Sequence, residues 1–184
     1  MRTMRRTLIL VASMLAATGF ASGLPVVPTE VQLAVFQNVW KLDRNFAAPV
    51  RMAILYQENH HASVAVKNEV VAAIAAGKLP IHCVALEVGT PQLMEQVMRS
   101  TDANVVYIAP LRAIDIEAIA KISRQRRIRS VTGIPEYVEA GIGVGIGVKK
   151  NRPLIIVNLA GARAEGAEFA AQLLNLARIV GPIS

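Results

Sequence analysis

Between residues 50 and 132, short apolar runs of strand length alternate with longer stretches that carry helix signals. The expected strands are Val50–Tyr56, Ile81–Leu86, Asn104–Ala109 and Ser130–Thr132. The expected helices are Ser63–Ala76, Thr90 or Pro91 to Arg99, and Ile114–Arg127. Strands that alternate with helices of this length form parallel βαβ units with right-handed crossovers. The chain is therefore restricted to an α/β fold with a largely parallel sheet.

The stretch "GIGVGIGV" at residues 141–148 places a glycine at every second position. A phosphate-binding loop of this composition opens a helix. Here a polar turn and another apolar run, Leu154–Asn158, follow instead, so the period of two predicts a strand with one bare face. A bare face is usually compensated by the close approach of another backbone or of a ligand. We expect Ile142–Val148 and Leu154–Asn158 to form an antiparallel hairpin.

Two further helices are expected outside this region. Thr29 has the chemistry of an N-cap before Glu30 and opens a helix to about Lys41. The other runs from about Ala164 to Ile179 and packs on the sheet. Its apolar face comprises Phe169, Leu173, Leu176, Ala177 and Val180. The resulting prediction is a three-layer α/β domain with a mostly parallel sheet, an antiparallel C-terminal hairpin and a packed C-terminal helix.

The first residues have the pattern of a secretory signal peptide. Arg2, Arg5 and Arg6 precede an apolar run at 8–20 that ends in small residues and is short for a membrane span. We expect a signal peptidase to remove residues 1–21. The alternative cleavage site lies two residues later. Residues 22–28 then form an extended lead-in to a single domain at 29–184, and the mature protein is periplasmic and does not span the membrane.

Charge and cysteine content narrow the function further. Removal of the three leading arginines lowers Lys+Arg from 20 to 17 against 13 acids, so the formal net charge falls from +7 to +4. Nucleic acid is a poor partner for an exported protein of this charge. The arginines at 124, 126, 127 and 129 are expected to be solvated at a helix end, where cations complement the helix dipole. The single cysteine, Cys83, excludes an internal disulfide.

The sequence offers no constellation for catalysis, for a cofactor or for a metal. The adjacent pair His60 and His61 lacks a third ligand at a recognisable spacing. We therefore expect a binding protein rather than an enzyme. In open parallel sheets, ligands bind beyond the carboxyl ends of the strands, near the point where strand order reverses. Polar residues at these ends are candidate ligand contacts, with a solvated loop edge as the alternative: Tyr56, Gln57, Glu58, Asn59, Thr132 and Glu136.

The expected first helix carries two apolar stripes, whereas one helix on one sheet needs only one. Val31, Ala34, Val35, Val39 and Leu42 form the first stripe. Leu33, Phe36 and Trp40 form the second. The second stripe is either core beneath a loop or an exposed aromatic patch that binds a partner protein.

Most of the mature chain follows one recognisable order. It consists of the helix "VQLAVFQNVWKLDRNF", three strand–helix units and the tail "TGIPEYVEAGIGVGIGVKKNRPLIIVNLAGARAEGAEFAAQLLNLARIV". In this order the chain resembles the YfiR/HmsC family of small periplasmic proteins. In the tail, a hairpin with a charged turn leads into Val157-Asn158-Leu159 and then into Ala162-Arg163-Ala164-Glu165-Gly166. "KLDRN" stands where many members carry an aromatic, Pro-ended segment.

The resemblance implies a periplasmic regulator that binds the periplasmic part of an inner-membrane signalling protein, a diguanylate cyclase, and represses it. The best-studied members look redox-responsive through paired cysteines, and one cysteine excludes that mechanism within this chain. A homodimer is left open. The alternative function is a small-ligand-binding module related to periplasmic solute-binding proteins.

Overall fold

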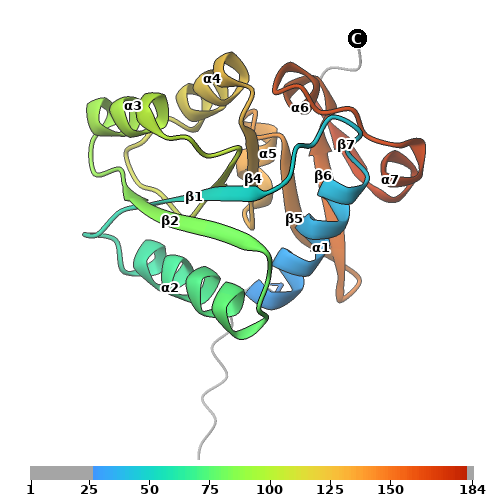
Figure 1. Ribbon diagram of the computed structural model, residues 1–184, viewed down its shortest axis with the longest axis horizontal. Coiled ribbons are helices and arrows are strands. Elements are labelled where there is room, and N and C mark those ends of the chain that lie inside the picture. Colours follow the sequence, from blue (N-terminus) through green and yellow to red (C-terminus); the bar gives the residue numbers. More distant parts are fainter. Residues whose placement is uncertain (1–26, 182–184) are drawn as a thin grey trace, which may run out of the picture.

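A seven-stranded sheet organises the computed structural model, which describes residues 27–181 (Figure 1). The strand order is β2-β1-β3-β4-β5-β6-β7. The strands are β1 (Val50–Tyr56), β2 (Ile81–Glu87), β3 (Val105–Ile108), β4 (Arg129–Thr132), β5 (Val144–Lys149), β6 (Arg152–Asn158) and β7 (Arg178–Val180). Neighbouring strands are parallel except β5 and β6, which form the expected antiparallel hairpin. The predicted fold class is confirmed.

One face of the sheet is covered by α1 (Thr29–Lys41) and α2 (His61–Ala76). Apolar side chains of these two helices share a core cluster with Met52, Ile54 and Val105 of the sheet. Gly77 follows α2 directly. The expected N-cap is wrong by one residue: Pro28 occupies that position and Thr29 is the first residue of α1. The Thr29 hydroxyl donates to Glu69 Oε2 of α2 at 2.9 Å instead of capping the helix.

The other face of the sheet is covered by α3 (Pro91–Ser100), α4 (Ile116–Arg126) and the short α5 (Pro135–Glu139). Thr90 caps α3 by accepting from the Leu93 N–H, and Asp115 caps α4 by accepting from the Glu117 N–H. A second core cluster lies beneath these helices and includes Leu55 of β1 and Ile108 of β3. The molecule therefore has the three layers that the sequence predicted.

The glycines of β5 face α5. A Cβ at Gly145 would collide with Val138 Cγ2, and one at Gly147 would lie 3.2 Å from Pro135 Cγ. A Cβ at Gly143, just before the strand, would lie 2.6 Å from Glu165 Oε2. The bare face is thus covered by side chains rather than by another backbone, and the phosphate-loop reading has no support in this geometry.

The expected C-terminal helix is wrong as a single element. Residues 159–180 form α6 (Leu159–Ala164), α7 (Ala171–Leu176) and β7. The break follows Glu165, where Gly166 has a φ of +91°, and an isolated bridge then pairs Phe169 with Asp43. The apolar spacing that suggested one helix face does not mark one, because Leu176 is 67% exposed while Leu173 is buried.

The expected signal peptide and most of the lead-in lie outside the described residues. Within residues 27–181, the helices are too short or too polar to cross a membrane.

Candidate functional site

The sheet has a topological switch point between β1 and β3, because the chain runs outward from β1 to β2 and then returns to the other side of β1. Loop 109–113, which follows β3, lies at this point. Gln57 holds the loop from one side, accepting from the Arg112 N–H at 2.5 Å and donating to the Arg112 carbonyl at 2.9 Å. Tyr137 holds it from the other side through both backbone groups of Leu111, at 2.9 and 3.2 Å.

The predicted ligand contacts therefore do not form one open site. Gln57 and Thr132 are buried and take part in internal hydrogen bonds, Thr132 with the Ile108 carbonyl at 3.0 Å. Glu58, Asn59 and Glu136 are exposed. The Tyr56 ring carries Lys67 Nζ 5.0 Å from its centroid. His60 Nδ1 lies 3.1 Å from the Pro110 carbonyl, so its ring also holds loop 109–113.

The second stripe of α1 lies in the core. Leu33 and Phe36 are 0% exposed and Trp40 is 6% exposed. Of the two alternatives for Leu33, Phe36 and Trp40, the structure therefore shows core rather than an exposed partner surface, and the core lies against the sheet instead of beneath a loop. The first stripe is divided: Val31 is 38% exposed and Ala34 is exposed, whereas Val39 is buried and Val35 and Leu42 pack partly buried against the core.

Trp40 nevertheless lines a surface groove at the amino-terminal edge of β1. Its ring stacks on Phe46 with a centroid distance of 5.6 Å, and Phe36 stacks on its other side at 6.3 Å. The groove has a volume of about 480 Å³. It is lined by Gln37, Trp40, Lys41, Asp43, Phe46, Ala48, Val50 and Pro80. We refer to these eight residues as the aromatic groove.

A buried polar network lies behind this groove. Asp43 accepts from Arg129 Nε at 2.9 Å, and the two side chains are 1% and 12% exposed. Asp43 also accepts from the backbone N–H groups of Asn45 and Glu168, at 3.0 and 2.9 Å. Arg129 begins β4 instead of ending a helix, and it donates to the Gly166 carbonyl at 2.9 Å. The expectation that this arginine is solvated is therefore wrong.

Glu165 is a second buried acid in the network. Its carboxylate accepts from the Ser130 N–H at 2.9 Å and from the Ser130 hydroxyl, which in turn accepts from the Gly143 N–H at 2.8 Å. Burial raises the pKa of Glu165 to about 8, although the Ser130 hydrogen bonds and the charges of Arg129 and Arg124 lower it in part. The sequence did not reveal this network, since Asp43, the Arg129–Ser130 pair and Glu165 come from three segments that are distant in the chain.

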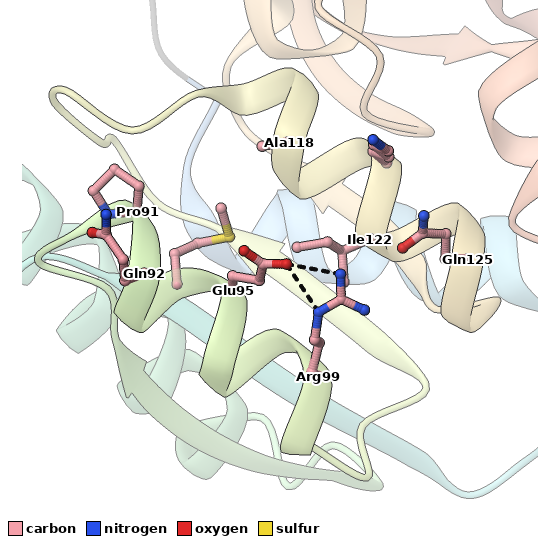
Figure 2. A pocket seen from close by; sticks show the side chains of 9 residues that line it. Pro91, Gln92, Glu95, Arg99, Ala118, Ile122 and Gln125 are labelled. Carbon is pink, nitrogen blue, oxygen red and sulfur yellow. Dashed lines mark hydrogen bonds and ion pairs between the residues drawn. The ribbon is translucent and has the colours of Figure 1, made fainter.

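A second groove separates α3 from α4 and has a volume of about 280 Å³ (Figure 2). The Glu95 carboxylate receives two bonds from Arg99, at 3.0 and 2.8 Å, and both residues belong to α3. Figure 2 shows Ala118 and Gln125 of α4 across the groove from them. Lys121 also lines it, so its walls are amphipathic and carry both charges.

Sequence comparison places these features in a known group, because the family model described as YfiR/HmsC-like matches residues 43–178. The chain belongs to the YfiR/HmsC-like family. The matched residues include every strand of the sheet except the last two residues of β7. They also include Asp43, Arg129, Ser130 and Glu165, so the buried network lies wholly within the family domain. No curated protein matches the chain significantly.

Solved structures share the fold of this chain at low sequence identity. The ABC domain from Streptococcus pneumonia, in complex with L-Trp, matches with a TM-score of 0.66 and 10% identity, over 83% of this chain and 62% of that one. A conserved domain protein from Vibrio cholerae O1 biovar El Tor matches with a TM-score of 0.64 and 12% identity, over 84% and 60%.

A third match is the ligand-free, open form of a substrate-binding protein with adhesive properties from Clostridium difficile. Its TM-score is 0.62 at 15% identity, over 84% of this chain and 60% of that one. The chain thus spans about three fifths of the length of the structures that it matches. At these identities the likeness concerns the fold alone.

Proposed function

We propose that this protein is a periplasmic regulatory binding protein that contacts the periplasmic part of an inner-membrane signalling protein, a diguanylate cyclase, and restrains it. Membership of the YfiR/HmsC-like family over residues 43–178 is the observation that carries this proposal. The charged leader and apolar run of residues 1–21 support export. The role proposed is binding rather than catalysis.

The aromatic groove is the proposed contact surface. Interfaces concentrate their binding energy in aromatic and apolar side chains at the centre of the contact. Trp40 and Phe46 provide such a centre, and their stacking fixes the rings before a partner arrives. Gln37 and Lys41 line the same groove and supply polar groups beside the apolar floor. Trp40 is accordingly proposed as a wall of the site rather than as a protruding anchor.

The experiment is a pull-down from inner membranes with the mature protein as bait, followed by a cyclase assay of the captured protein. We expect the captured protein to convert GTP to cyclic di-GMP, and the bait to lower that rate. Capture of a permease, or a cyclase rate that the bait leaves unchanged, contradicts the proposal.

A matched pair of variants tests the groove. Ala48→Glu places a charge in the aromatic groove, and it should weaken capture at least about tenfold because an unpaired charge is costly in an apolar contact. Ala171→Glu is the control, because Ala171 is also exposed and begins α7 outside the groove. Equal capture by both variants would remove the groove from the interface, provided that both melt like the wild type.

The second candidate function is binding of a small ligand, as in the periplasmic solute-binding proteins. The fold likeness to a substrate-binding protein and to a domain solved with L-Trp favours it. The closed switch point argues against it, because Gln57 and Tyr137 fasten loop 109–113 where open sheets of this type bind ligands. Calorimetry with L-tryptophan and a mixture of the other amino acids tests this function, and saturable heat would favour it.

A further inference from the structure

Among residues 27–181, strand β2 forms one edge of the sheet, and a row of its backbone groups has no strand to pair with. The Val88 N–H, just past the strand, donates to the Tyr56 carbonyl of β1 at 2.8 Å. Since backbone groups point alternately to the two sides of a strand, residues of the same parity as Val88 face β1. The others, Cys83, Ala85 and Glu87, direct their N–H and carbonyl groups to the open side.

This edge lacks the devices that normally prevent pairing. It is seven residues long, and its centre, Cys83-Val84-Ala85, carries neither a charge nor a proline. Val84 is 48% exposed, which is unusual for a large apolar side chain in the middle of a strand. His82 and Ala85 are exposed as well, so neither a helix nor a loop of the described chain covers the edge.

We propose that β2 pairs antiparallel with β2 of a second copy of this chain, across a two-fold axis at Val84. In this register Cys83 of each copy lies opposite Ala85 of the other, so that outward backbone groups meet outward groups. Val84 lies opposite Val84 of the second copy in a non-hydrogen-bonded pair, where side chains approach closest. The two seven-stranded sheets become one continuous sheet.

Charge favours a second copy in this orientation. Lys78 precedes β2 and is exposed, and Glu87 ends it. An antiparallel copy brings the basic end of each strand towards the acidic end of the other, whereas a parallel copy would align like charges. The self-complementary patch is the kind that a two-fold homodimer uses. This proposal is independent of the proposed regulatory function.

Analytical ultracentrifugation of the mature protein tests the dimer. The wild type should sediment at twice the monomer mass. Val84→Lys should raise the dissociation constant of the dimer at least about tenfold, because it replaces an apolar contact by two facing cations. Leu176→Lys is the matched control, since Leu176 is 67% exposed and lies next to β7, at the opposite edge of the sheet. It should remain dimeric.

Two further measurements identify the two-fold contact itself. A mixture of Val84→Lys and Val84→Glu proteins should restore a dimer that neither forms alone. In a Cys83→Ser background, Val84→Cys should form a disulfide between copies on oxidation, since facing residues at such a pair lie about 4.5 Å apart between Cα atoms. A monomeric wild type overturns the proposal, as does a dimer that Val84→Lys leaves intact, or a β2 edge that pairs only with the membrane partner.

Discussion

Glu165 is a carboxyl group enclosed by protein, and its protonation is coupled to folding. In an unfolded chain it ionises near its ordinary value of 4.5, whereas burial raises its pKa in the folded protein to about 8. Between these pH values the folded state binds more protons than the unfolded state. The stability that Glu165 contributes is therefore fully present below about pH 4.5 and is lost as pH rises through about 8.

Urea unfolding at about pH 5 and about pH 8 measures this coupling. For Glu165 alone, the free energy of unfolding should fall with rising pH by up to about 1.4 kcal/mol per unit. Glu165→Gln cannot ionise, so its free energy of unfolding should fall less over the same range. Parallel pH profiles for the wild type and the variant would contradict the buried-carboxyl interpretation.

Gly145 illustrates a close contact that excludes any side chain. Gly145→Ala should lower the free energy of unfolding by about 1–3 kcal/mol, because the new Cβ meets Val138 Cγ2 of α5. Combining it with Val138→Ala removes that methyl group, and the double variant should be more stable than the sum of the two single effects predicts. Strict additivity in thermal or urea unfolding would show that α5 does not press on this strand.

At the scale of elements, the C-terminal segment is held by long-range contacts rather than by its own helix. The stretch between α6 and α7 bridges to Asp43 through Phe169, and its Glu168 N–H donates to the Asp43 carboxylate. Arg129 binds the Gly166 carbonyl of the same stretch. The Asp43–Arg129 ion pair thus joins the end of α1, the start of β4 and the C-terminal segment.

Neighbouring residues provide a matched test of this junction. Asp43→Ala leaves the buried Arg129 charge without its partner and should cost about 3–5 kcal/mol of unfolding free energy. Arg44→Ala removes the ion pair between Arg44 and Glu168, whose side chains are 69% and 54% exposed respectively. Because this pair is exposed to solvent, its loss should lower the free energy of unfolding by at most about 1 kcal/mol. Similar losses for both variants in urea unfolding would show that the Asp43 pair is not a junction.

At the scale of the whole molecule, the proposed location depends on processing of the first residues. Cleavage near Ala21 should leave a mature chain that begins at Ser22 or Leu24, because small residues at 19, 21 and 23 suit the cleavage sites. N-terminal sequencing of protein from the periplasmic fraction checks this expectation. A chain that still begins with Met1 would contradict export by signal cleavage.

The candidate site was less predictable than the sheet. Gln57 and Thr132 are polar residues at strand ends, but both are buried in internal hydrogen bonds, Gln57 with loop 109–113 and Thr132 with the Ile108 carbonyl of β3. The stripe of α1 was ambiguous, since periodicity does not tell which of two apolar faces meets the sheet. Glu165 and Asp43 carried no local signal, because their partners lie 35 and 86 residues away in the chain.

The sequence by itself determined the alternation of helices and strands from α1 to β4, the β5–β6 hairpin and the parallel sheet, because these follow from short-range periodicity and from the handedness of βαβ connections. It indicated neither the short helix α5 nor the strand β7. Only the tertiary structure decided which face of α1 is buried, where the C-terminal segment breaks, and that the switch point is closed. Those outcomes depend on contacts between distant residues, such as Gln57 with Arg112 and Asp43 with Arg129, whose energies no local pattern records.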